Sequence, residues 1–222
     1  MRRPYTSPAA AIAASLRAVG QPRSAILRNG VRARIRPLRL DDARRYGDFV
    51  SKLSEPSRDG RFHGDVDDRT PFALQQRVCV DGVRHVVFVA AVALADGEEL
   101  IGEVRYCVGD EPGCAEVAIA VIDAWQGQGL ADQLIDCLLE AAHDAGLRRL
   151  YGEVPATHTR MVSFLHRMGF QICPQGSSGD LLRLERGVSP RRPQRARGLP
   201  GALRRWLIGQ FALGVQSPLK TP

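Results

Sequence analysis

The chain has 222 residues, 44% of them hydrophobic and 25% charged, which suits one globular domain with a sizeable core and terminal extensions. Its formal net charge of +7 is unevenly spread, because residues 1–40 hold nine arginines and residues 186–222 hold eight basic residues, and neither segment has an acidic one. The residues between them carry 14 basic side chains against all 24 acidic ones, a surplus that would attract a cationic amine.

Several other classes of protein are disfavoured by residue spacing. No apolar run approaches the roughly eighteen residues of a membrane span. Five cysteines without a Cys-x-x-Cys pair and five histidines without ligand spacing predict no metal site, and the odd cysteine count suits reduced thiols in the cytoplasm. The arginine run at 191–197 lacks interleaved aromatic residues, so we expect no specific nucleic-acid recognition.

Strands are predicted to dominate the first half of the chain. A strand around Ile35 leads to a helix start at which Asp41 or Asp42 is a candidate N-cap. Three β-rich runs follow at residues 85–94, 99–108 and 114–122. The first two are joined by Ala95-Asp96-Gly97, which predicts a hairpin.

Two helices and a strand are predicted in the second half. Apolar residues at helical spacing begin at Leu130, and Gly146 supplies a stop signal. A strand is expected over residues 148–154 and a helix over residues 157–168, directly before Gly169-Phe170. The spacing of residues 199–213 allows one further short helix in the basic tail.

The turn between the third strand run and the long helix has the composition of an anion-binding loop. Its residues Gln126-Gly127-Gln128-Gly129 include no side chain bulkier than glutamine. Small residues let successive backbone N–H groups converge on one point, and the helix dipole adds roughly half a positive charge there. We therefore expect a pyrophosphate at this turn.

Three classes of phosphate loop compete for this segment. A P-loop would need Gly-Lys-Ser/Thr, which does not follow Gly129, and a dinucleotide fingerprint would need a small residue at Asp132. The pattern Gln/Arg-x-x-Gly-x-Gly/Ala fits Gln126 to Ala131 at every specified position. The segment thus resembles the coenzyme A loop of the GNAT superfamily of N-acetyltransferases. Taken alone, these six residues also fit an ordinary glycine-containing turn that opens an amphipathic helix.

The resemblance extends over residues 31 to about 186, through the order of the elements and the Gly169-Phe170 step. Residues 53–64 and Ala115-Glu116-Val117-Ala118 also resemble the acetyltransferase domain of bacterial Pat-type protein lysine acetyltransferases. The resemblance implies an α/β (α+β) GNAT fold, with a mixed, mostly antiparallel central sheet, a splayed strand pair and flanking helices. Its expected limits are a basic extension over residues 1–30, the GNAT domain over residues 31–187 and a basic tail over residues 188–222.

The resemblance also implies the cofactor, acetyl-CoA, as co-substrate. Its pyrophosphate would bind the backbone of Gln126, Gly127, Gln128, Gly129, Leu130 and Ala131. Its pantetheine arm carries amides that can extend a splayed strand edge, and would pair with Ile119, Ala120 and Val121.

Transfer of an acetyl group to an amine needs a group that accepts the amine's proton. Glu116 is the candidate base, because the matching position in Pat-like enzymes is a glutamate assigned that role. The apolar strand that follows it would partly desolvate the carboxylate and raise its pKa toward the working pH. The alternative is a strand-end carboxylate in solvent. For a second carboxylate, Glu103, a cross-strand ion pair is the expected role.

Two positions depart from the superfamily pattern. His158 stands where many members carry an asparagine, and Leu165 where many carry the tyrosine that protonates the leaving thiolate. The general acid is therefore unassigned. The first functional hypothesis is an acetyl-CoA-dependent N-acetyltransferase that acts on a small amine or a protein lysine. The alternative is a GNAT-fold module that binds acyl-CoA as a sensor or regulatory partner, with little catalysis.

Overall fold

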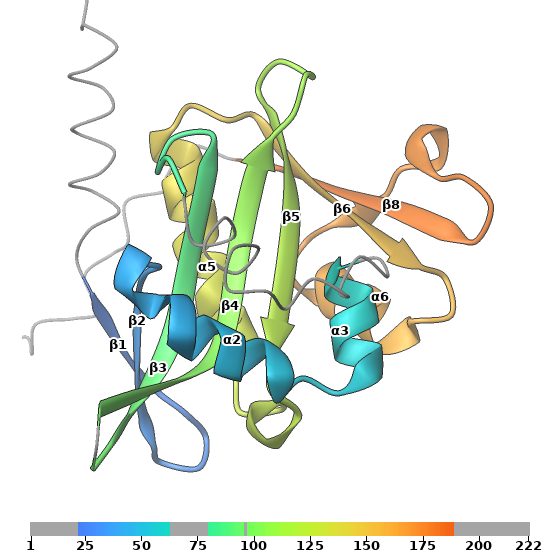
Figure 1. The fold of residues 1–222 in the computed structure, drawn as a ribbon. Coiled ribbons are helices and arrows are strands. Elements are labelled where there is room, and N and C mark those ends of the chain that lie inside the picture. The colour runs from blue at the N-terminus through green and yellow to red at the C-terminus, as the bar shows by residue number, and fades with distance from the viewer. Residues whose placement is uncertain (1–21, 63–79, 96, 189–222) are drawn as a thin grey trace, which may run out of the picture. The chain divides into compact units, whose positions relative to one another are not determined.

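Eight strands form one sheet in the part of the chain that the computed structural model describes, which is residues 22–62, 80–95 and 97–188 (Figure 1). The strands are β1 (Arg23–Ile26), β2 (Arg32–Pro37), β3 (His85–Leu94), β4 (Gly97–Val108), β5 (Cys114–Val121), β6 (Arg149–Pro155), β7 (Gln171–Ile172) and β8 (Leu181–Gly187). Their order is β1-β2-β3-β4-β5-β6-β8-β7. Only β5 and β6 run parallel in this described sheet, so the expected mixed, mostly antiparallel fold is confirmed.

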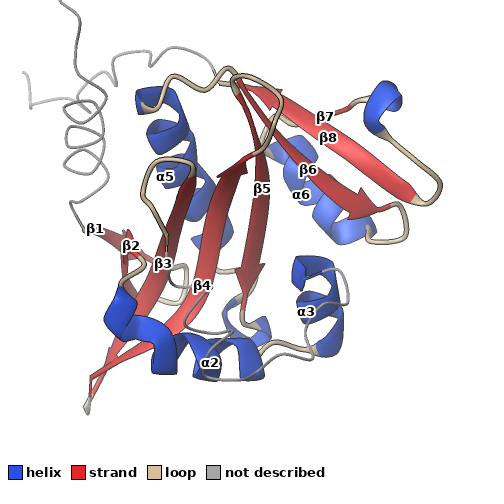
Figure 2. Cartoon of the chain, turned by 45° about the horizontal axis from the view of Figure 1, so that its top comes forward, coloured by secondary structure: helices blue, strands red, loops and turns tan. Residues whose placement is uncertain are grey.

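Helices cover both faces of the sheet (Figures 1 and 2). The α-helices are α2 (Ala43–Ser51), α3 (Glu55–Phe62), α5 (Leu130–Asp144) and α6 (Thr159–Arg167). The short 3-10 helices are η1 (Leu40–Asp42), η2 (Asp123–Trp125) and η3 (Pro174–Gly176). In Figure 2, α2 and α3 lie on one face while α5 and α6 lie on the other.

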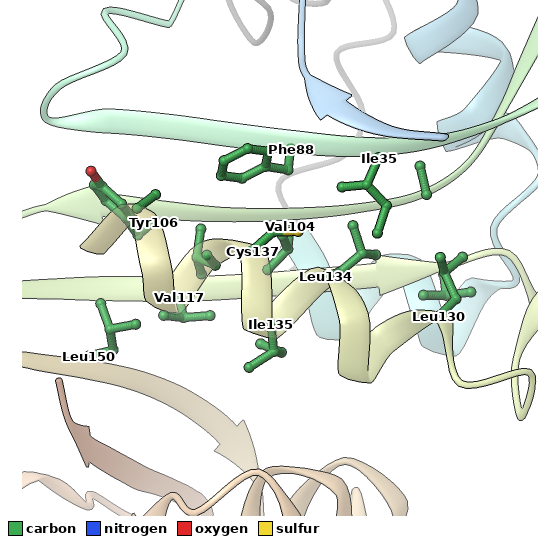
Figure 3. Close-up of a cluster of buried hydrophobic side chains, with 14 of the residues drawn as sticks. Ile35, Phe88, Val104, Tyr106, Val117, Leu130, Leu134, Ile135, Cys137 and Leu150 are labelled. Atoms are coloured by element: carbon green, nitrogen blue, oxygen red, sulfur yellow. The ribbon is translucent and has the colours of Figure 1, made fainter. Parts of the chain in front are cut away.

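Alternation along the central strands divides the buried side chains into two cores. On β3, Val86 and Phe88 join the core under α5, whereas Val87 and Val89 join the core under α2. The α5 side is the larger, and Figure 3 shows Leu134 and other helix residues packed against the strands. The sheet is therefore buried on both faces at its centre, which holds the ends of β4 and β5 in place.

Strand β1 lies inside residues 1–30, which the sequence assigned to an extension. It pairs antiparallel with β2 from Arg23↔Ile35 to Ile26↔Arg32, and Ala25 is buried in the α5 core. We therefore propose domain limits of about residues 22 and 188. Within these limits the sequence has 21 basic and 24 acidic residues, so the acidic surplus inferred from the sequence is much smaller for the folded domain. The basic tail and its possible helix lie outside the described residues.

A buried ion pair fixes the start of α2 to β2. The guanidinium of Arg36 donates to both carboxylate oxygens of Asp42, at 2.6 and 2.8 Å, and both side chains are only 1% exposed. Arg36 also reaches Glu98 on β4 at 2.9 Å. Asp42 occupies the N-cap position of α2, as one of the two expected caps, but its carboxylate accepts from Arg36 and from the Arg39 amide. Burial opposes ionisation, yet these hydrogen bonds hold the pKa of Asp42 below its ordinary range.

Replacing Asp42 by asparagine is expected to lower the free energy of unfolding by about 3 kcal/mol, because it leaves a buried guanidinium short of one partner. The matched control is Asp41→Asn, an exposed neighbour, for which we expect a change within about 0.5 kcal/mol. Denaturant unfolding measures both.

The effect of Asp42 also has a predicted pH dependence. Since its pKa is lower in the folded than in the unfolded state, its contribution is complete above the ordinary carboxyl pKa and is lost as the pH falls. The difference in stability between wild type and Asp42→Asn should therefore shrink in acid. A difference that stays constant down to the acid unfolding transition would contradict this account.

Candidate active site

The two parallel strands of the sheet part soon after they meet. β5 and β6 pair at only three positions, ending at Glu116↔Tyr151, and then diverge (Figure 2). On its other side β5 remains paired with β4 as far as Val121. Among the described residues, the β6-facing edge of β5 beyond Glu116 has no strand partner, so its peptide groups are available to a ligand. The expected splayed strand pair is thus present.

The diverging strands β5 and β6 form a V, and a cavity of about 460 Å³ lies at its open end. It is bounded by the end of β5, the turn that follows, the start of α5 and parts of α3 and α6. Eight of the nine residues predicted to bind the cofactor line it, namely Ile119, Ala120, Val121, Gln126, Gly127, Gly129, Leu130 and Ala131. Gln128 does not line the cavity, and its carbonyl oxygen accepts a hydrogen bond from the amide of Arg28.

The turn between β5 and α5 has the backbone that its composition predicts. Gly127 and Gly129 have φ angles of +74° and +80°, a region that side chains other than glycine rarely adopt. Gly129 is the N-cap of α5, so the first amides of this helix open onto the cavity wall formed by Leu130 and Ala131. Backbone N–H groups at a helix N-terminus can bind an anion, so the geometry is compatible with the predicted pyrophosphate.

The side chain of Gln126 stabilises the turn itself. Its amide nitrogen donates to the carbonyl oxygen of Val121 at 3.0 Å and to the carboxylate of Asp123 at 3.2 Å. Asp123 also accepts from the backbone amide and the hydroxyl of Ser54, directly before α3. Burial opposes ionisation, yet these bonds hold the pKa of Asp123 below its ordinary range. The network links α3 to the turn and leaves the turn's backbone for a ligand.

Glu116 stands where β5 and β6 part, and it is exposed. The expected desolvation by the apolar strand is therefore absent. The reason lies on the two neighbouring strands, where Cys107 is exposed and Tyr151 is only half-buried. Alternation places Glu116 on the same sheet face as Cys107, opposite the face that α5 covers. The carboxylate does not line the cavity but lies three residues along β5 from Ile119, roughly 10 Å at strand rise.

Glu103 has a structural role that differs from the expected one. Its carboxylate is fully buried and pairs at 2.8 Å with the guanidinium of Arg105, two residues further along the same strand. The pair with Arg105 lies within β4, where a spacing of two residues puts both side chains on one face of the strand, whereas the sequence predicted a cross-strand pair. Arg105 also donates to the hydroxyl of Tyr46 on α2 at 2.8 Å.

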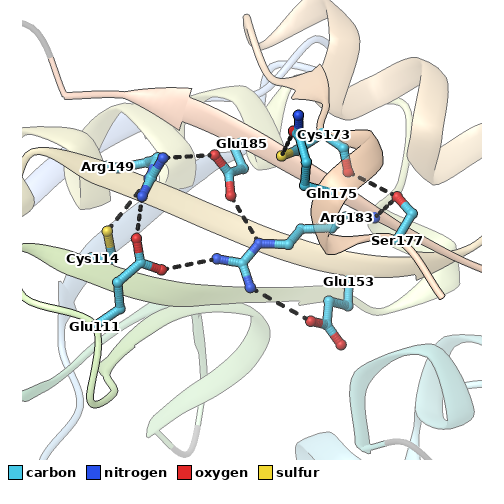
Figure 4. A network of polar contacts seen from close by, with 9 residues as sticks. All are labelled: Glu111, Cys114, Arg149, Glu153, Cys173, Gln175, Ser177, Arg183 and Glu185. Carbon is cyan, nitrogen blue, oxygen red and sulfur yellow. Dashed lines mark hydrogen bonds and ion pairs between the residues drawn. The ribbon is translucent and has the colours of Figure 1, made fainter.

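A network of charges beside Glu116 was not anticipated from the sequence. Arg183 on β8 stacks on the ring of Tyr151, with 3.7 Å between guanidinium carbon and ring centroid. Burial, followed by the charge of Glu116, raises the pKa of Tyr151. The ion pairs around it involve Glu111, Arg149, Glu153, Arg183 and Glu185 (Figure 4). The network holds β6 and β8 together on the face where Glu116 is exposed.

Three arginines at the cavity were also missed. Arg160 and Arg167 line it from α6, and Arg28 lines it from the turn between β1 and β2. A spacing of seven puts Arg160 and Arg167 on one helix face, a signal that the sequence contained. No sequence pattern pointed to Arg28, because it lies near the cavity only once β1 has paired with β2.

The two positions that depart from the superfamily pattern, His158 and Leu165, lie in different environments. His158 precedes α6 and lines the cavity. Leu165 is 4% exposed and belongs to the α5 core, so nothing at this position can protonate a leaving group.

Within the described ranges, no group of three or more histidine, cysteine or acidic side chains could hold a metal ion. None of the helices described is long and apolar enough to cross a membrane.

Comparison with known proteins identifies the family. The model of the Acetyltransferase (GNAT) family matches residues 52–170. A Pseudomonas aeruginosa protein named acetyltransferase PA5475 is 34% identical over 161 residues, covering 71% of this chain and 86% of that protein. The chain belongs to the GNAT family of acetyltransferases. It is an acetyl-CoA-dependent N-acetyltransferase.

Solved structures agree with this assignment. The GNAT domain of Streptomyces lividans PAT matches with a TM-score of 0.65 and 29% identity, over 75% of this chain and 96% of that one. The Salmonella typhimurium protein yncA, whose structure contains acetyl-CoA, matches with a TM-score of 0.53 over 74% of this chain and 98% of that one. At 17% identity the second likeness shows the fold.

Replacing Gly129 by glutamate is expected to weaken acetyl-CoA binding by about a hundredfold or more, because a carboxylate would lie beside the pyrophosphate. The matched control is Gly146→Glu after the end of α5, where the φ angle is +74° and no atom lies within 4 Å of the added Cβ. Both variants should lose similar stability, about 1 kcal/mol, from the left-handed backbone. Calorimetric titration and thermal unfolding separate the two effects, and equal affinities in both variants would exclude this turn as the pyrophosphate site.

Proposed function

We propose that this protein acetylates the side-chain amine of protein lysines, with Glu116 as the general base. The observation that carries the proposal is the position of Glu116, exposed at the apex of the V whose open end forms the cavity. A coenzyme with its pyrophosphate at Gly127 to Ala131 and its pantetheine arm along Val121 to Ile119 would direct its thioester toward that apex.

The free edge of β5 supports this path for the pantetheine arm. The arm carries two amides, which can bond to a strand edge as a further strand would. Beyond Glu116 that edge has no strand partner among the described residues, and Ile119, Ala120 and Val121 line the cavity. The same row of backbone N–H groups offers a donor to the thioester carbonyl, where negative charge develops during attack.

A protonated amine has no free lone pair, so it must lose a proton before its nitrogen can attack the thioester. The exposed carboxylate of Glu116 accepts that proton directly or through a water molecule. With Leu165 buried, the thiolate leaves without a tyrosine at the usual position. A thiolate is a good enough leaving group for the reaction to proceed in this way.

Lysine of a protein is proposed as the acceptor for two reasons. The fold and sequence are similar to those of the GNAT domain of S. lividans PAT, at 29% identity. In addition, Glu116 is exposed beside the ion-pair network of β6 and β8, whose three carboxylates outnumber its two guanidinium groups, so a cationic side chain is attracted.

The thiols of Cys107, Cys114, Cys137 and Cys173 are free, which supports the expected cytoplasmic location.

Release of free thiol from acetyl-CoA should be measured over a panel of small amines, lysine peptides and purified proteins. We expect turnover with lysine-containing proteins or peptides, and acetyl-lysine in the products. Turnover with small amines alone would show that the acceptor is a small amine and not a protein lysine. Coenzyme binding without turnover on any acceptor would favour the sensor hypothesis.

Replacing Glu116 by glutamine is expected to lower kcat by roughly 10²- to 10⁴-fold while the dissociation constant of acetyl-CoA stays nearly unchanged, because the amide keeps the shape but accepts no proton. The control is Glu103→Gln, which breaks a buried ion pair and should lower the unfolding temperature with little change in kcat. Near-normal turnover in Glu116→Gln would show that another group accepts the proton.

A further inference from the structure

The turn between β1 and β2 lies directly against the phosphate-binding turn, although the two are far apart in the sequence. The backbone amide of Arg28 donates to the carbonyl oxygen of Gln128 at 3.2 Å, and its Nη1 donates to the carbonyl oxygen of Gly127 at 3.0 Å. One residue therefore holds two successive carbonyl groups of the turn.

Arg28 is itself held in place by its neighbours. Leu27 donates to the carbonyl oxygen of Val31, and Gly30 donates to that of Leu27, which closes a tight turn around Arg28. The side chain of Leu27 is 2% exposed and lies in the same core as Leu130, the first residue of α5. The position of Arg28 relative to the phosphate-binding turn is thus fixed by packing on both sides.

Holding these two carbonyl groups also orients two amides. The peptide unit is planar and trans, and no cis peptide bond occurs among the described residues, so each C=O points opposite to the N–H of the following residue. Fixing the carbonyls of Gly127 and Gln128 toward Arg28 turns the N–H groups of Gln128 and Gly129 to the opposite side of the turn. With either carbonyl rotated inward, an oxygen would face the phosphate and repel it.

Arg28 also brings a charge to the cavity. Arg28 lines the cavity, and its Nε lies 3.9 Å from where a Cβ of Gly129 would be. A guanidinium has five N–H donors, of which the contact with Gly127 uses one, so its charge and remaining donors can act on an anion in the turn.

We propose that Arg28 is a positioning residue for coenzyme binding, which holds the carbonyls of Gly127 and Gln128 outward and so prepares the turn for the pyrophosphate. The proposal rests on the proposed function in that the ligand is acetyl-CoA. It gives β1, which lies outside the limits expected from the sequence, a role in the active site.

The test compares two ligands in the full chain, acetyl-CoA and S-acetylpantetheine, which keeps the thioester and pantetheine but has no pyrophosphate. For Arg28→Met we expect the dissociation constant of acetyl-CoA to rise about tenfold, the size of one lost charge-assisted contact. Binding of S-acetylpantetheine, measured by titration, should stay within about twofold of wild type. Arg28→Lys should recover part of the affinity for acetyl-CoA, since it keeps a cationic donor.

The control is Arg32→Met, which removes the same charge from an exposed position at the start of β2 and should leave both affinities unchanged. Equal weakening of both ligands in Arg28→Met would show that Arg28 only stabilises the fold, and unchanged acetyl-CoA affinity would show that the turn needs no support from β1. Either result overturns the proposal. Failure of the wild-type protein to bind acetyl-CoA would instead overturn the proposed function.

Discussion

The parting of β5 and β6 is the feature on which the site depends. Each strand has a full partner on its outer side, β5 with β4 over seven positions and β6 with β8 over seven, but they share only three with each other. The sheet thus stays continuous at one end and opens at the other. The open end leaves the edge of β5 beyond Glu116 without a strand partner among the described residues, beside a cavity that helices α3 and α6 border.

Three features stabilise the turn between β5 and α5. Glycines at positions 127 and 129 allow its backbone angles, the Asp123 carboxylate ties its start to the segment before α3, and Arg28 bonds to its carbonyl groups from the turn between β1 and β2. Such support matters for catalysis because a preorganised cradle does not have to reorder when the coenzyme binds.

Charge is buried in two places on the α2 side of the sheet. Arg36 pairs with Asp42 beneath the start of α2, and Arg105 pairs with Glu103 beneath its middle. Apolar residues of similar size would commonly be at least as stable, so these pairs are weak evidence of added stability. Their geometry does specify where α2 begins and which face of β4 it covers, and α2 leads directly to the segment before α3 at the cavity.

The order of β2 to β6 with helices α2, α5 and α6, the glycine turn and the GNAT family could be read from the sequence, because periodic apolar residues and a short loop pattern are local signals. Elements β1, α3, β7 and β8 were not predicted. Eight of the nine predicted cofactor residues line the cavity for the same reason: they follow one another along a strand, a turn and a helix start. Three features depended on tertiary structure instead. Glu116 is exposed because its neighbours on two other strands are not fully buried. Glu103 is buried because α2 packs over β4, and Arg28 reaches the turn because β1 pairs at the sheet's edge. In each case the environment of a side chain is set by residues distant in the chain, and no local pattern records it.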